Sequence, residues 1–227
     1  YYPLRNIRIR RLLASCVKKV VVYSKAMEEF MHANGITNTA FVHHSVDDLP
    51  VIAADTVAAY RKRLGLTGPT VYFGGRLSGD KGMDSLLAAA ELVVRDLPHA
   101  QFLIGGDTER LAPYMSRVSP ALKERLVPTG WVSLDDFKVA LAASDVVTVP
   151  SVYLDALATM NLWGMAAGKP VVGSVFGGAP DAIIDGSSGL TTGGETGYLV
   201  NPHDSVQFAD RLKRLLSDPA LAKTMGQ

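Results

Sequence analysis

The 227-residue sequence has very little cysteine and no long hydrophobic run, and each absence excludes a class of protein. A single cysteine, Cys16, cannot form an internal disulfide, so the fold is not built on disulfides and a reducing compartment is expected. We expect its thiol to be buried and unreactive. No stretch approaches about 18 uninterrupted apolar residues, which excludes membrane-spanning helices. The N-terminus lacks the apolar segment of a cleavable signal peptide, so none is expected.

Acidic residues are absent from the first 25 residues, which carry a formal charge of +7 within a chain of net charge +1. This basic segment has two interpretations: the solvated face of one helix, or a surface that contacts an anionic membrane. The sequence has no zinc-ligand spacing and no interleaved aromatic and basic residues, so we expect no nucleic-acid partner. The whole chain contains 48% hydrophobic and 20% charged residues, which is typical of a globular protein.

Hydrophobic periodicity predicts an alternation of strands and helices along most of the chain. We predict strands at residues 17–23, 39–43, 70–74, 100–104, 126–128, 146–149, 170–173 and 198–200. We predict helices at residues 4–16, 25–34 with Ser24 as N-cap, 55–64, 81–96, 112–125 with an interruption at Pro120, 134–144, 156–167, 180–185 and 205–217. Strands separated by helices predict an α/β fold, a Rossmann-like, doubly wound parallel sheet that is covered on both faces.

The loop after the predicted strand 70–74 contains three glycines and two cations, Arg76 and Lys81. Glycines let the backbone approach a ligand, and the following helix offers free N–H groups. Arginine and lysine bind phosphate oxygens well, so the loop has the composition of a diphosphate site. It matches neither a Walker A loop nor a GxGxxG dinucleotide fingerprint. The alternative is a glycine turn with two surface cations.

Two later loops also lead from a strand into a helix. Asp155 is predicted in the first turn of the helix 156–167, where a carboxylate either bonds sugar hydroxyls or caps the helix. Gly177 lies in a glycine-rich loop that either holds its backbone at a ligand or only turns the chain. Met160 and Met165 have helical spacing and are interpreted as core. The sequence has no cluster of metal-ligating residues, so no metal site is expected.

Six motifs occur in an order and spacing that together resemble one family. They are, in chain order, Gly75-Arg76 with Lys81-Gly82, Leu103 to Gly106, Val127 to Gly130, Ala143 to Ser151, Gly164 to Val172, and Gly177 to Asp181. From about residue 14 onward, the chain resembles the C-terminal, donor-binding domain of retaining GT-B glycosyltransferases (glycosyl transferases group 1, family 4-like). The resemblance implies that the enzyme transfers a hexose from a nucleotide-diphospho-sugar to an acceptor hydroxyl.

The resemblance also implies roles for individual residues. Arg76, Lys81 and Asp155 match the catalytic positions: the two cations hold the donor diphosphate and the acid contacts the donor sugar. Further positions match parts of the donor site that bind the diphosphate, base, sugar or ribose: Gly75, Trp131, Leu157, Ala158, Thr159, Trp163 and Gly177. The donor is a substrate with a UDP, GDP or ADP group. No cofactor and no metal are implied, because the two cations supply the charge that a divalent ion supplies elsewhere.

The sequence departs from the family pattern at several of these positions. Trp163 occupies the place of the acid that bonds the ribose hydroxyls, and an indole N–H only donates. Asp155 replaces a glutamate, Ala158 replaces a glycine, His44-Ser45 replace Asn-Gly, and residues 187–194 look like an insertion. Three alternatives follow besides the same reaction: an altered nucleotide donor, a degenerate non-catalytic nucleotide-sugar-binding or scaffolding module, and another GT-B activity such as that of a sugar-nucleotide epimerase.

The resemblance finally predicts two parts in this chain. Residues 1–38 would be the C-terminal remnant of the N-terminal, acceptor-binding GT-B domain, and residues 39–227 the Rossmann-like nucleotide-sugar-binding domain. Most of the acceptor-binding domain is then a missing partner, and this chain alone is expected to be inactive. Because related enzymes act on lipid acceptors, the basic N-terminal segment is expected to contact a membrane peripherally. The implied location is cytoplasmic, at the inner membrane face.

Overall fold

Six short runs of mainly β-branched, leucine and aromatic residues form one parallel sheet in the computed structural model, which describes residues 7–186 and 194–227. The strands are β3 (Thr70–Gly74), β4 (Gln101–Gly105), β5 (Leu126–Gly130), β6 (Val146–Val149), β7 (Val171–Ser174) and β8 (Gly197–Val200). Their order is β5-β4-β3-β6-β7-β8. Strands β3, β4 and β5 are thus added toward one edge of the sheet, and β6, β7 and β8 toward the other, so the strand order reverses between β3 and β6, as in doubly wound α/β folds. The predicted fold class is confirmed.

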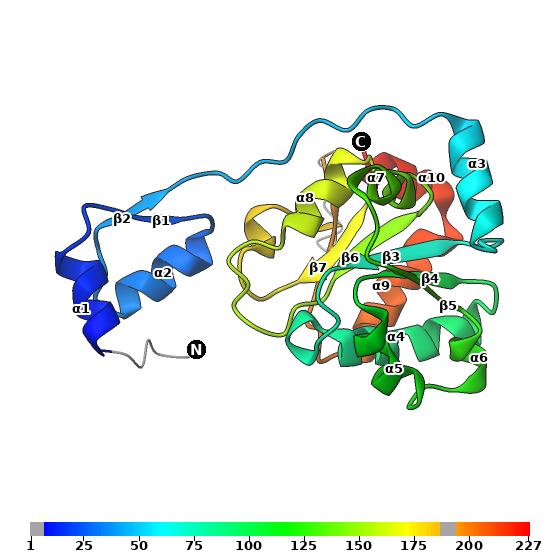
Figure 1. Cartoon of the computed structure of the whole chain (residues 1–227), viewed down its shortest axis with the longest axis horizontal. Helices are drawn as coiled ribbons and strands as arrows, with labels where there is room; N and C mark the ends of the chain where they lie inside the picture. The colour runs from blue at the N-terminus through cyan, green and yellow to red at the C-terminus, as the bar shows by residue number, and fades with distance from the viewer. Residues whose placement is uncertain (1–6, 187–193) are drawn as a thin grey trace.

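Helices cover both faces of this sheet (Figure 1). On β3, Val71 and Phe73 point into the core beneath α4 (Met83–Asp96) and α9 (Ser205–Ser217), whereas Tyr72 points to the opposite face. That second face is covered by α3 (Ala54–Arg63), α7 (Leu134–Ala142) and α8 (Thr159–Ala166). Burial on both sides explains why the strands are continuous apolar runs in the sequence and do not alternate with polar residues.

Several predicted boundaries differ from the structure. The helix predicted at 81–96 begins at Met83, after a short 3-10 turn, η1 (Gly79–Lys81), and the helix predicted at 156–167 begins only at Thr159. The predicted helix 112–125 is two helices, α5 (Thr108–Met115) and α6 (Pro120–Lys123). The helix predicted at 180–185 is a 3-10 turn, η2 (Ala179–Asp181), and α10 (Pro219–Met225) was not predicted. The proposed insertion lies mostly outside the described residues.

The first part of the chain forms a small separate unit from α1 (Ile7–Ser15), β1 (Val20–Val22), α2 (Lys25–Ala33) and β2 (Thr39–Phe41). The two strands pair in parallel, with Val20 opposite Thr39. Ser24 caps α2 as predicted, since its hydroxyl accepts a hydrogen bond from the Met27 amide at 3.2 Å. The expectation that Cys16 is buried was wrong: Cys16 is exposed, and it lies just past the end of α1.

An extended segment, residues 42–53, connects this N-terminal unit to α3 of the larger domain (Figure 1). The two parts also touch directly: the Lys25 amide donates to the Asp181 carboxylate at 2.5 Å. The Ser24 side chain packs against Gly178, where a Cβ would lie 2.7 Å from the Ser24 Cβ. Because β2 pairs with β1, the expected domain boundary at residue 38 falls between two paired strands. The assignment of residues 1–38 and 39–227 to two different GT-B domains stays a prediction.

No helix in the two described stretches combines the length and the apolar character needed to cross a membrane.

Candidate functional site

The carboxyl ends of three neighbouring strands form an open floor of glycine backbone. Gly74-Gly75 end β3, Gly105-Gly106 end β4, and Gly130 ends β5. The Gly75 amide donates to the Gly105 carbonyl, and the Gly106 amide donates to the Gly130 carbonyl, both at 3.1 Å. At Gly106 a Cβ would lie only 2.4 Å from the Gly75 carbonyl oxygen. Gly106 is therefore required by backbone packing, whereas a Cβ at Gly75 would have nothing within 4 Å, so a ligand can approach the backbone closely there.

Lys81 and Asp155 join the two loops that flank the point where the strand order reverses. The Lys81 Nζ donates to Asp155 Oδ2 at 2.6 Å, and the two side chains are 21% and 13% exposed. The Ser151 hydroxyl donates to the same carboxylate oxygen at 3.0 Å, and the Lys81 ammonium lies 5.2 Å from the centre of the Tyr153 ring. Ligands of doubly wound folds bind at this crevice, so the pair has the expected position for a site.

The charge of Lys81 is maintained by these partners. Burial alone lowers the pKa of Lys81, but the hydrogen bonds and attraction of Asp155 and Tyr153 outweigh it and raise the pKa above its usual value. Lys81 is therefore a permanent cation at neutral pH, held in a partly desolvated place where its charge acts strongly on an anion.

Asp155 is not a helix cap, so that interpretation was wrong. Helix α8 begins at Thr159, and its N-cap residue is Ala158, which makes no side-chain capping bond. The segment 151–158 stays in a loop because Asp155 is fixed from two sides, by Lys81 and by the Gly178 amide, which donates to the Asp155 carbonyl at 2.8 Å. The carboxylate thus binds a lysine in the crevice and does not bind the backbone of α8.

Arg76 is not brought together with Lys81. Its guanidinium donates to Asp80 Oδ2 at 2.9 Å on the surface, and the Arg76 side chain is 59% exposed. The two residues come from one loop, but only Lys81 lines the cavity beside the glycine floor. Arg76 therefore contributes to the site only if its side chain leaves Asp80 and turns toward a ligand.

A cavity of about 270 Å³ lies between the first glycine turn and the start of α8. Lys81, Ala158 and Thr159 line it on the polar side, and the first turn of α8 supplies backbone N–H groups there. Trp163 and Phe137 also line it, with their rings edge to face and 5.7 Å between centres. The cavity therefore combines one cation and a helix N-terminus with an aromatic wall.

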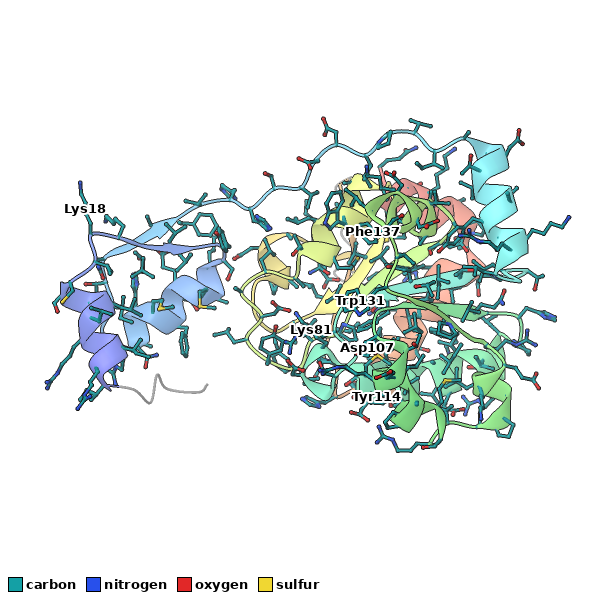
Figure 2. All side chains as sticks on the ribbon, in the orientation of Figure 1. Lys18, Lys81, Asp107, Tyr114, Trp131 and Phe137 are labelled. Carbon is teal, nitrogen blue, oxygen red and sulfur yellow. The ribbon has the colours of Figure 1, made fainter. Side chains whose placement is uncertain are left out.

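A second cavity, of about 380 Å³, adjoins the first, because Gly74, Gly75, Phe137 and Met160 line both. Trp131 stands at its rim with 74% of its surface exposed, directly after the Gly130 turn. Figure 2 shows Lys81, Trp131 and Phe137 reaching this end of the sheet from three different elements. The two cavities together provide space for a charged group at one end and a planar ring at the other.

Gly177 lies behind the Lys81–Asp155 pair, outside these two cavities. Its φ is +70°, and a Cβ there would lie 2.2 Å from the Asp155 carbonyl oxygen, so only glycine allows this loop to pack against the Asp155 loop. Gly177 also lines a cleft of about 600 Å³ between the N-terminal unit and the larger domain, together with Lys25, Tyr153 and His203. Leu157 is half-buried, and its side chain lines none of these three spaces.

Some residues of the site were missed in the sequence. Phe137 and Met160 form the shared wall of the two cavities, although Met160 was interpreted as core. Tyr153 and Ser151 contact the Lys81–Asp155 pair. In the sequence, these residues could have been found only from their positions along the chain. Each one follows a predicted strand or lies in the first turns of the next predicted helix. Within residues 7–186 and 194–227, no three His, Cys, Asp or Glu side chains are grouped closely enough to hold a metal ion.

Comparison with protein families gives one assignment. The family model for glycosyl transferases group 1 matches residues 68–218, which is more than half of the chain. The sequence is 30% identical over 173 residues to the α-D-kanosaminyltransferase of Streptomyces kanamyceticus, covering 75% of this chain and 42% of that protein. It is 31% identical over 203 residues to the D-inositol 3-phosphate glycosyltransferase of Streptomyces avermitilis, covering 83% of this chain and 41% of that protein.

Solved structures share the fold. Anabaena HepE in complex with UDP-glucose superposes with a TM-score of 0.82 at 22% identity, covering 96% of this chain and 60% of that chain. The sucrose-phosphate synthase of Thermosynechococcus elongatus superposes with a TM-score of 0.78 at 26% identity, covering 96% and 54%. The chain thus spans about two fifths of the length of the two curated relatives and little more than half of these two structures.

Proposed function

Because the chain belongs to the group 1 glycosyltransferases, we propose that it is the donor-binding half of a retaining enzyme that transfers a hexose from a nucleotide-diphospho-sugar to an acceptor hydroxyl. The observation that carries the proposal is the Lys81–Asp155 pair at the strand-order reversal, beside the glycine floor and the start of α8. The pair brings a cation for a diphosphate within 2.6 Å of a carboxylate for a sugar.

The two cavities suggest how a donor lies in the site. The diphosphate occupies the polar side of the smaller cavity, against Lys81 and the N–H groups of Ala158 and Thr159. The base lies in the adjoining cavity, where the exposed ring of Trp131 stacks on it. The hexose then lies at Asp155, whose carboxylate accepts hydrogen bonds from sugar hydroxyls. This arrangement requires Lys81 to bind the diphosphate, and Asp155 to bind the hexose, in addition to or in place of their bond to each other.

Charge stabilisation is the chemical contribution of this half of the enzyme. When the sugar leaves, negative charge develops on the diphosphate, and the fixed positive charge of Lys81 stabilises it without any rearrangement. Arg76 adds a second positive charge once its guanidinium leaves Asp80 and binds a phosphate oxygen. The change replaces one exposed ion pair with another, so its cost in free energy is small. These two cations are proposed to stabilise the negative charge of the leaving diphosphate, which a metal ion stabilises in other transferases.

The acceptor is proposed to bind on a domain that this chain carries only in part. Apolar side chains are exposed on the N-terminal unit and at the start of the extended segment, which supports a covering domain that would bury them: Ile7, Ile9, Leu12, Val21, Tyr23 and Val42. We infer that this chain alone binds donor weakly and transfers no sugar. The basic residues of the unit, with Lys18 on its outer side (Figure 2), are proposed to contact an anionic membrane at its cytoplasmic face.

Calorimetric titration with UDP, GDP and ADP tests the proposal. We expect one of the three diphosphates to bind, and Arg76→Ala to weaken that binding about tenfold, because a charged hydrogen bond to phosphate is lost. Arg95→Ala is a matched control: Arg95 is 68% exposed and pairs with Asp96 at 3.0 Å, but it lies at the C-terminal end of α4 and lines neither cavity. Binding of none of the three, or equal weakening by both variants, would contradict a donor site.

A second candidate is a nucleotide-sugar-binding module without catalysis. Trp163 favours it, because the indole and Phe137 leave the apolar side of the smaller cavity without a hydrogen-bond acceptor for ribose. An assay of the complete protein for sugar transfer, in the presence of its donor, distinguishes the two candidates. A transferase transfers the sugar, whereas a binding module does not. Binding without transfer by the complete protein would favour the module.

A further inference from the structure

A pocket of about 430 Å³ opens at the opposite end of the sheet from the candidate site. Its floor consists of the residues just before three strands: Gly68-Pro69 before β3, Asp145 before β6, and Gly168 to Pro170 before β7. Arg61 of α3 closes one side, and the end of α9 with α10 closes the other. The pocket is within the range of volumes typical of small-molecule sites.

Positive charge is concentrated in this pocket. Arg61, Lys169 and Lys223 line it, and Asp145 is the one carboxylate among its lining residues, which leaves a formal charge of about +2 at neutral pH. Arg61 and Lys169 are both half-buried, and burial is the main reason that the pKa of Lys169 is lowered. A cation whose pKa is lowered by burial lacks a full compensating charge in its surroundings.

The hydrogen bonds of the two half-buried cations go to neutral acceptors. The Arg61 guanidinium donates to the carbonyls of Ala143 and Gly68, at 2.5 and 2.7 Å. The Lys169 ammonium donates to the Ala142 carbonyl at 2.9 Å. The Asp145 carboxylate accepts a bond from the Thr70 amide at 2.7 Å, and no ion pair joins it to these cations within the described part of the chain.

A purely structural role accounts for part of this arrangement. Ala142 and Ala143 end helix α7, so Arg61 and Lys169 also act on the negative end of that helix dipole. That role does not account for Lys223, which is exposed. It also does not account for the apolar residues that line the pocket beside the cations: Pro69, Pro170, Leu215 and Leu216. A helix end carries only about half a charge, so the pocket stays cationic.

We propose that this pocket binds a small organic phosphate monoester, with its dianionic phosphate against Arg61, Lys169 and Lys223 and its carbon body against the prolines and leucines. Arginine and lysine together supply both a forked donor and a point charge for phosphate. The pocket and the donor site lie at opposite ends of the same strands, β3 and β6, so both can be occupied at once.

Titration of the 227-residue chain with inorganic phosphate and with ribose 5-phosphate tests the proposal, with ribose as the uncharged control. We expect ribose 5-phosphate to bind several-fold more tightly than inorganic phosphate, since only it packs on the apolar surface. We expect Lys169→Met to weaken this binding at least about tenfold and Lys223→Gln about threefold. Lys223 is exposed, so its substitution tests the site even if Lys169→Met does not fold.

Four outcomes would overturn the proposal. One is no binding of ribose 5-phosphate up to about 10 mM, which is weaker than metabolite sites generally reach. Another is parent-like affinity in the folded lysine variants. The third is loss of binding in Arg76→Ala, which would place the ligand at the donor loop instead. Equal affinity for inorganic phosphate and ribose 5-phosphate would also overturn it, because the carbon body would then make no contact.

Discussion

Trp163 stands where the family pattern has an acid that bonds the ribose, so it raises the question of how this cavity recognises a ribose. Its indole lies edge to face with Phe137 and lines the cavity that also holds Lys81. The side chain thus faces the cavity, where it supplies an apolar wall and no hydrogen-bond acceptor. Recognition of a ribose by this face would have to depend on packing.

Trp163→Glu tests whether this position faces the ribose. We expect the variant to bind the preferred nucleoside diphosphate about tenfold more tightly, since a carboxylate accepts hydrogen bonds from ribose hydroxyls. We also expect it to unfold about 2–4 kcal/mol more easily, because the Phe137 contact is lost. Calorimetry and urea unfolding measure the two effects. Trp163→Leu is the control without an acceptor; equal affinity of the two variants would indicate that position 163 does not face the ribose.

Asp96 provides a pH-dependent link between α4 and α9. It accepts hydrogen bonds from Arg95 at 3.0 Å and from Lys213 of α9 at 2.8 Å, and these lower the pKa of Asp96 to about 2 from its usual 3.8. A carboxyl with a lowered folded-state pKa stabilises the protein above its unfolded-state pKa and loses that effect as the pH falls. The window is therefore between about pH 4 and pH 2.

We accordingly expect Asp96→Asn to lower the urea midpoint at about pH 6, and this difference from the parent protein to shrink as the pH falls from about 4 to 2. The pair is exposed, so added salt should reduce the difference as well. Urea unfolding followed by circular dichroism across this range measures it. A difference that is constant with pH would show that the Asp96 charge is not responsible.

At the scale of elements, the turn between η1 and α4 positions Lys81. Gly82 has a φ of +82°, and a Cβ there would lie 1.9 Å from the Pro150 carbonyl oxygen. The turn therefore packs directly against the loop that carries Asp155, and this contact holds the two halves of the Lys81–Asp155 pair together. A side chain at position 82 would force the two loops apart.

Gly82→Ala should therefore lower the free energy of unfolding by about 2–4 kcal/mol and weaken nucleotide binding, because both backbone strain and a backbone clash are introduced. Gly35→Ala is the matched control. Gly35 has a similar φ of +77° but nothing within 4 Å of its Cβ position, so it should lose only about 1 kcal/mol. Urea unfolding of both variants measures the difference. Equal losses would argue against a tight contact between the two loops.

The whole molecule has two parts that are joined loosely. Among the described residues, the N-terminal unit contacts the larger domain through Lys25 with Asp181 and through Ser24 with Gly178. Residues 42–53 form neither helix nor strand and are mostly exposed, with Val51 at 99%. Such a segment offers a protease an extended, accessible backbone.

Limited thermolysin digestion should accordingly cut first within residues 42–53 and leave a fragment of the larger domain. The fragment should keep the nucleotide affinity of the whole chain, because the cavity residues lie between Tyr72 and Trp163. Mass spectrometry identifies the cut, and calorimetry measures binding. First cuts within the helices or strands of residues 54–227, or loss of nucleotide binding by the fragment, would contradict this division of the molecule.

Local patterns in the sequence determined the alternation of strands and helices, most boundaries of the larger domain and the glycine-rich loops at its ligand edge. These follow from periodicity and turn chemistry, which act over a few residues. The start of α8 was predicted three residues too early, because Ala156, Leu157 and Ala158 are good helix formers, whereas the tertiary contacts of Asp155 hold them in a loop.

Only the tertiary structure decided which side chains meet. Lys81 and Asp155 are 74 residues apart and bond because β3 and β6 are neighbours in the sheet, while Arg76, only five residues before Lys81, turns to Asp80. It also decided that Met160 faces a cavity, and that Arg61, Lys169 and Lys223 share one pocket. Periodicity assigns a residue to a face of its own element, but the partner on that face depends on the order in which the strands pair.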